Sequence, residues 1–189
     1  MSGDGNNKAC HGENVGTASA PEAAARCRFF GEANANVHAA HAAKQQSSPA
    51  FDADHDVGGH VCTSNLQFAR EQASRKGPQD RTGICGFVCK HGTPAKGCFV
   101  DMPAPEQFMY YFYLLAYLLR RRPDMVKGKF YVDIACRLSG SWRTWVTREA
   151  VSGVACITWL GLRLVVPWMH AAAHNMACQL AFSALFEVS

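Results

Sequence analysis

The sequence has 189 residues, of which 48% are hydrophobic, and a formal net charge of +4; this fits one ordinary globular domain with flexible sequence left over. Residues 1–75 hold six basic and eight acidic residues, whereas residues 76–150 hold twelve and six. We expect the positively charged residues 76–150 to attract polyanions such as nucleic acid, with ordinary solubilising charge as the alternative. The longest apolar run, residues 108–119, is too short for a membrane span of about 20 residues.

Nine cysteines are present, and the N-terminus has no apolar stretch typical of a secretory signal. We therefore expect a reducing compartment, in which cysteines are more often core thiols or metal ligands than disulfides. Residues 1–60 are rich in small and polar residues, and they are predicted to form a disordered, low-complexity tail. The Ala-rich stretch 18–43 has no apolar stripe, so at most a transient helix outside any core is expected there.

Order is predicted to begin near Val61, which makes residues 61–189 the folded domain. A short helix is expected at 66–74, before the Gly77-Pro78 break. Residues 83–89 and 97–102 are predicted to be the two strands of a hairpin with a longer loop.

The clearest predicted element is a helix at 105–122. Pro105 suits a first helical turn, the apolar body follows, and the basic run 120–122 favours the negative end of the helix dipole. Pro123 then stops the helix.

The remaining elements alternate between strand and helix. Residues 129–135 are predicted as a strand, 141–160 as a helix, 162–166 as a short strand and 169–182 as a helix. A hairpin followed by alternating helices and strands indicates an α/β fold with a mixed sheet covered by helices.

Asp133 and Asp80 are candidate metal-binding carboxylates. Asp133 interrupts an apolar strand, where a charge needs compensation, and Asp80 lies where the first strand begins. Two carboxylates on adjacent strands can hold divalent cations such as Mg²⁺, which suits phosphoryl transfer. In the alternative, Asp80 caps a turn and Asp133 pairs with an arginine.

A second group of candidates comprises His170, His174 and Cys178, whose i, i+4, i+8 spacing places them near one face of the predicted helix. Residues 171–173 are all alanine, so the glutamate of a zinc protease is missing. A structural Zn²⁺ joining this helix to two upstream ligands is one interpretation, with core thiols and hydrogen-bonded histidines as the alternative. The upstream candidates are Cys89 and His91, with Cys85 and Cys98 nearby.

Aromatic and basic residues also alternate in the sequence at Trp142, Arg143, Trp145 and Arg148. Such side chains can stack on nucleic-acid bases. Tryptophans buried on the inner face of an amphipathic helix are the alternative.

Taken together, these motifs resemble the Kyakuja-Dileera-Zisupton (KDZ) transposase family over roughly residues 62–182. Cys62 and Phe68-Ala69 resemble its upstream elements. The motifs that carry the resemblance are Asp80-Arg81-Thr82-Gly83-Ile84, Cys89-Lys90-His91-Gly92, Tyr131-Val132-Asp133-Ile134-Ala135-Cys136, and Pro167-Trp168-Met169-His170 with Ala173-His174 and Cys178.

The resemblance implies a nuclear DNA transposase with an RNase H-like core that uses three acidic residues and Mg²⁺ to cut DNA and join strands. It makes Asp80 the first acid and Asp133 the second, with Asp101 as a rival for the first position. The family supplies its third acid in a later Gly-Glu motif, whereas this sequence ends seven residues after Phe182, and Glu187 lacks that context.

We therefore expect a partial RNase H-like core, either a fragment, a decayed copy or a mispredicted gene product, with little strand-transfer activity alone. A zinc-stabilised nucleic-acid-binding module without catalysis is the second interpretation. A plain α/β domain with packed cysteines and histidines is the third.

Overall fold

The computed structural model describes residues 2–6, 11–12, 30–46, 79–81, 83–104 and 107–183, with the backbone alone for 2–6, 11–12, 44–46 and 79–81. The predicted helix at 66–74 and the residues Cys62, Phe68, Pro105 and Glu187 lie outside this range. No helix within these ranges is long and apolar enough to cross a membrane.

The chain divides into two compact units. The hairpin unit comprises Asp4–Phe51 and Leu66–Leu118, and the C-terminal unit comprises Met1–Gly3, Asp52–Asn65 and Leu119–Ser189. The expected division at residue 60 stays a prediction.

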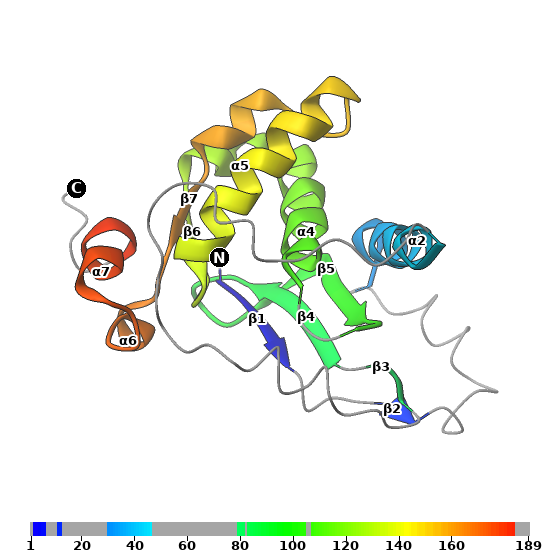
Figure 1. The fold of residues 1–189 in the computed structure, drawn as a ribbon, viewed down its shortest axis with the longest axis horizontal. Coiled ribbons are helices and arrows are strands. Elements are labelled where there is room, and N and C mark those ends of the chain that lie inside the picture. Colours follow the sequence, from blue (N-terminus) through cyan, green and yellow to red (C-terminus); the bar gives the residue numbers. More distant parts are fainter. Residues whose placement is uncertain are drawn as a thin grey trace. The chain divides into compact units, whose positions relative to one another are not determined.

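The predicted hairpin is confirmed as β4 (Gly83–Val88) and β5 (Pro94–Met102), which pair antiparallel (Figure 1). Alternate residues of β4 are buried, as expected for a strand with one face toward a core. Two short strands, β2 (His11–Gly12) and β3 (Gln79–Arg81), form a separate antiparallel pair.

Helix α2 (Glu32–Gln46) packs on β5, and its Ala33 and Val37 are fully buried. The side-chain oxygen of Asn34 accepts a hydrogen bond from the backbone N–H of Asp101 at 2.9 Å, which fixes the helix to the strand. The expectation that the Ala-rich stretch stays outside a core is therefore wrong. Small side chains on two successive turns are enough to let a helix approach a strand closely.

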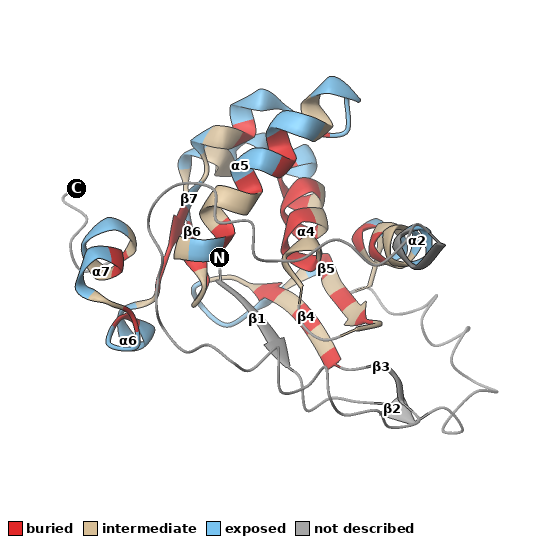
Figure 2. Ribbon diagram, viewed as in Figure 1, coloured by how far each residue is buried: buried red, intermediate tan, exposed pale blue. Residues whose placement is uncertain are grey.

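Helix α4 (Phe108–Arg121) matches the body of the predicted helix, whose first residues lie outside the described range. Figure 2 shows that it is buried along most of its length. The hydroxyl of Tyr110 donates to the carbonyl of Ala104 at 3.0 Å and accepts from its N–H at 3.2 Å, so it ties the helix to the segment after β5.

In the C-terminal unit, the 3₁₀ helix η1 (Pro123–Lys127) leads into β6 (Lys129–Tyr131). Helix α5 (Ala135–Val151) and the 3₁₀ helix η2 (Ile157–Gly161) follow, and β7 (Arg163–Val165) pairs parallel to β6. The N-terminal strand β1 (Ser2–Asn6) also pairs parallel to β6, at Ser2 and Tyr131. The fold is thus mixed α/β, with a β–α–β crossover in this unit.

The predicted strand 129–135 is shorter than expected, because the chain turns at Asp133 and α5 begins at Ala135. The predicted helix 169–182 is interrupted: α6 (Trp168–Ala171) ends before a turn, and α7 (Met176–Phe182) begins after it. The side chain of Asn175 accepts from the N–H of Cys178 at 2.8 Å, so a new N-cap replaces a continuous helix.

The tryptophans of α5 form the core of the C-terminal unit. Trp142 stacks on Trp145 with ring centroids 5.4 Å apart and on Trp159 of η2 at 6.3 Å. Trp142 is 1% exposed and Trp145 is 6% exposed, which leaves no ring face open for a base. The structure therefore favours the core alternative for these rings over base stacking.

A close contact in the hairpin unit predicts a specific cost of substitution. Gly97 of β5 has φ +73°, and a Cβ there would fall on the ring and hydroxyl of Tyr117. We expect Gly97→Ala to lower the free energy of unfolding by about 1–2 kcal/mol from backbone strain and by roughly 1–3 kcal/mol more from overpacking.

Gly92→Ala is the matched control, since Gly92 has φ +79° but its Cβ would meet no atom within 4 Å. Gly92→Ala should lower the free energy of unfolding only by the cost of backbone strain. Urea unfolding followed by far-ultraviolet circular dichroism measures both variants, and equal losses of stability would contradict the close contact with Tyr117.

Candidate metal centre

Three metal-ligating side chains meet in the C-terminal unit. The Nδ1 atom of His174 lies 3.2 Å from the Sγ of Cys178 and 3.5 Å from the Sγ of Cys136. All three ligand atoms lie within 4.8 Å of one another, and no other such group of three or more occurs among the described residues. His174 and Cys178 are each 5% exposed, and Cys136 is half-buried.

Helix ends position these ligands. Cys136 lies in the first turn of α5, Cys178 in the first turn of α7, and His174 just before α7. The side-chain amide of Gln179 donates to the carbonyl of His174 at 2.8 Å, which fixes the backbone there. His174 and Cys178 thus keep the close approach that their i, i+4 spacing indicated.

His170 does not join this group. It lies on α6, is exposed, and is separated from His174 by the turn at Ala172 and Ala173. The expectation that His170, His174 and Cys178 share one face of a single helix is therefore wrong. Cys136 was not predicted as a ligand, since the predicted strand ran through Ala135 and gave no sign that a helix starts there.

Cys89 and His91 lie in the hairpin unit, in the turn between β4 and β5. The Sγ of Cys89 is 3.9 Å from the Nδ1 of His91, so two ligating atoms are close, both outside a core. The N–H of Cys89 donates to the carbonyl of Thr93 at 2.9 Å and closes the turn. Cys85 and Cys98 are buried in the strands. A metal ion shared with the His170 region stays a prediction.

Hydrogen bonds in this turn lower the pKa of the Cys89 thiol from 9.0 to about 7. The backbone N–H of His91 makes the largest contribution, followed by the side chain and backbone of Thr93. Donors that point at the sulfur stabilise the thiolate over the thiol. Cys89 is therefore expected to be a reactive thiol near neutral pH.

We predict that alkylation of Cys89 by iodoacetamide reaches half its maximal rate at about pH 7, because only the thiolate reacts. Thr93→Val removes a hydroxyl donor and should raise this midpoint. His91→Ala keeps the backbone N–H and should change it little. Peptide mapping by mass spectrometry follows the reaction, and a wild-type midpoint at pH 9 would contradict the prediction.

The predicted acids fall in both units. Asp133 lies two residues after β6, in the turn before α5, and is partly exposed. In open α/β sheets, ligands bind outside the carboxyl ends of strands, which is where Asp133 lies relative to β6 and β7. Asp101 lies on β5, and Asp80 lies on β3 with its side chain outside the described range. The assignment of Asp80 and Asp133 as catalytic stays a prediction.

Residues 119–183 carry an excess of positive charge. Residues 119–183 contain nine basic residues, all exposed, and three acidic ones. Two of the acids pair with neighbouring arginines: Asp124 with Arg122, and Glu149 with Arg148, each at 2.9 Å. Arg122 holds the pKa of Asp124 below its usual range. The exposed bases are Arg120, Arg121, Arg122, Lys127, Lys129, Arg137, Arg143, Arg148 and Arg163.

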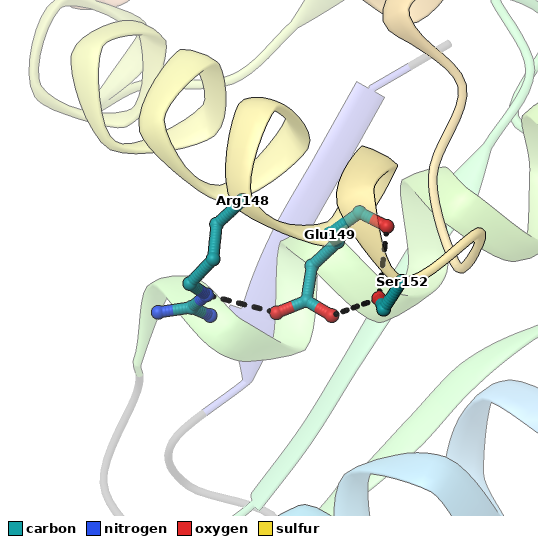
Figure 3. A network of polar contacts seen from close by, with 3 residues as sticks. All are labelled: Arg148, Glu149 and Ser152. Atoms are coloured by element: carbon teal, nitrogen blue, oxygen red, sulfur yellow. Dashed lines mark hydrogen bonds and ion pairs between the residues drawn. The ribbon is translucent and has the colours of Figure 1, made fainter.

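Figure 3 shows the second of these pairs at the C-terminal end of α5. The hydroxyl of Ser152 donates to the backbone carbonyl of Glu149 at 3.0 Å and lies 3.5 Å from its carboxylate. The same carbonyl also accepts from the backbone N–H groups of Val154 at 3.0 Å and Ala155 at 3.1 Å, so three donors close the end of the helix. The carboxylate of Glu149 pairs with the guanidinium of Arg148 at 2.9 Å.

An excess of exposed positive charge is one of the features that nucleic-acid-binding domains share. The family model for the Kyakuja-Dileera-Zisupton transposase matches residues 1–188, and the chain belongs to this family. The resemblance seen in the sequence is thus confirmed. Comparisons with curated proteins and with solved structures found no match.

Proposed function

We propose that the chain acts on DNA in the nucleus as a KDZ-type transposase domain with an RNase H-like core, in which Asp80 and Asp133 bind Mg²⁺. The match of the family model along residues 1–188 carries this proposal. The position of Asp133 beyond the carboxyl end of β6 supports it.

The chemistry of the carboxylate ligands is consistent with Mg²⁺ as the bound ion. A partly exposed carboxylate such as Asp133 offers the hard oxygen atoms that Mg²⁺ prefers, whereas sulfur and imidazole do not suit that ion. When bound, Mg²⁺ would polarise the scissile phosphate and activate the attacking oxygen. Asp133 would hold the ion at the strand end, where the positive charge of the ion could face the DNA phosphates.

The exposed positive charge of residues 119–183 supplies the attraction to DNA. Arginine and lysine side chains that neutralise phosphates release condensed counterions, so binding weakens as salt is added. Such contacts position the protein on the duplex without reading its sequence.

We expect the purified chain to bind duplex DNA with an affinity that falls steeply with salt. Arg143→Ala removes one exposed charge from α5 and should reduce the slope of log affinity against log salt by about 1 if Arg143 contacts a phosphate. Thr147→Ala, one turn further along the same helix, should leave the slope unchanged. Fluorescence anisotropy of a labelled duplex measures both, and binding that ignores salt would contradict the proposal.

A second experiment addresses Asp133 directly. Fe²⁺ can replace Mg²⁺ at carboxylate ligands, and with ascorbate and peroxide it cuts the nearby protein backbone. We expect cleavage next to Asp133, suppressed by excess Mg²⁺ and lost in Asp133→Asn. Asp124→Asn is the matched control in the same unit and should preserve the cleavage. Cleavage that persists in Asp133→Asn would remove Asp133 from the proposed metal site.

One observation favours a second function, a zinc-stabilised nucleic-acid-binding module without catalysis. The group of Cys136, His174 and Cys178 offers soft ligands suited to a structural metal. Under this alternative the chain binds DNA, but Asp133→Asn changes neither metal binding nor any action on DNA.

A further inference from the structure

The Nδ1 atom of His174 lies close to two sulfur atoms, whereas one hydrogen bond would need only one of them. A neutral imidazole nitrogen that is not protonated has a single in-plane lone pair, which suits one good hydrogen bond. Here one Nδ1 atom lies 3.2 Å from one sulfur and 3.5 Å from another. The three atoms therefore converge on a common centre, and two of the three side chains are almost fully buried.

The distances match those around a metal ion. Tetrahedral zinc with Zn–S bonds of about 2.3 Å and Zn–N bonds of about 2.0–2.1 Å separates sulfur from nitrogen by roughly 3.5 Å. The observed separations of 3.5 Å for Cys136 and 3.2 Å for Cys178 are close to this value. A small movement of two side chains would complete the geometry.

The chemistry of the ligands selects the metal. Two thiolates and an imidazole are soft ligands that favour zinc, whereas magnesium and calcium prefer oxygen. Sites of cysteine and histidine are typical of structural zinc, which stabilises the fold that it holds together, and the three side chains here would leave the fourth position to another ligand.

We propose that Cys136, His174 and Cys178 bind one Zn²⁺, and that this ion fastens the start of α7 to the first turn of α5. The third ligand is therefore Cys136 and not His170, which the spacing in the sequence had indicated. Both cysteines bind as thiolates, so each releases its proton when the metal enters.

The ion would also restrain the turn that carries Asp133, three residues before Cys136 on the chain. The N–H of Ala135 donates to the carbonyl of Val132 at 3.1 Å, and the N–H of Val132 donates to Val165 of β7 at 3.0 Å. With Cys136 fixed as well, the turn is held at both ends. This consequence rests on the proposed function of Asp133, whereas zinc binding does not.

Metal content of the full-length chain, purified under reducing conditions without chelator, tests the proposal. We expect about one zinc per chain by inductively coupled plasma mass spectrometry. His174→Asn and Cys178→Ser should lose most of it, because two remaining ligands hold the ion far more weakly than three. Cys156→Ser, an exposed cysteine of the same unit, and His170→Ala should keep it. Wild-type protein without zinc, or Cys178→Ser with the wild-type content, would overturn the site.

Cobalt gives a test whose deciding measurement uses the wild-type chain. Co²⁺ added to the metal-free wild-type chain should produce visible bands of tetrahedral cobalt and a near-ultraviolet thiolate charge-transfer band. Cys136→Ser leaves one sulfur ligand and should reduce the charge-transfer band to about half. A wild-type spectrum without thiolate bands would overturn the proposal.

The two proposals fail separately. A chain that holds zinc but shows no Fe²⁺ cleavage next to Asp133 keeps the zinc site and loses the proposed Mg²⁺ site. A zinc-free chain that is cleaved next to Asp133 keeps the proposed Mg²⁺ site and loses the zinc site.

Discussion

The convergence of two sulfurs on one imidazole nitrogen is the constraint on which the C-terminal unit depends. It joins the start of α5, the turn after α6 and the start of α7, three segments that the sequence places up to 42 residues apart, from Cys136 to Cys178. The turn at Asp133 leads directly into the first of these segments. Fixing the sulfurs therefore fixes the direction in which the chain leaves β6, and with it the carboxylate at the strand end.

Local chemistry in the sequence predicted the regular elements but not their ends. The alternation along β4 and the Pro123 stop after α4 are local signals, and both elements were predicted. The break between α6 and α7 was missed, because the alanines at 171–173 favour a helix while the cap at Asn175 forms only once α7 has a place to pack. Helix α2 was missed as a core element because Ala33 and Val37 are too small to form a visible apolar stripe.

Two of the three residues of the candidate site were predictable from the sequence, because only these two are close to each other along the chain. His174 and Cys178 are four residues apart, so helical spacing alone brings them together. Cys136 reaches them only through the β–α–β crossover, which brings residues distant in sequence to one point, and no local pattern reports that. Asp133 lies after the end of β6, and Cys136 lies three residues later in the first turn of α5.

The stacked indoles of α5 have a practical consequence. All four tryptophans of the chain, at 142, 145, 159 and 168, belong to the C-terminal unit, and the hairpin unit has none. Their emission consequently reports the loosening of one unit alone, while four of the five tyrosines, at 110, 111, 113 and 117, lie in α4 within the other unit. One sample, excited at two wavelengths, can thus show whether the two halves of the molecule melt together or in turn.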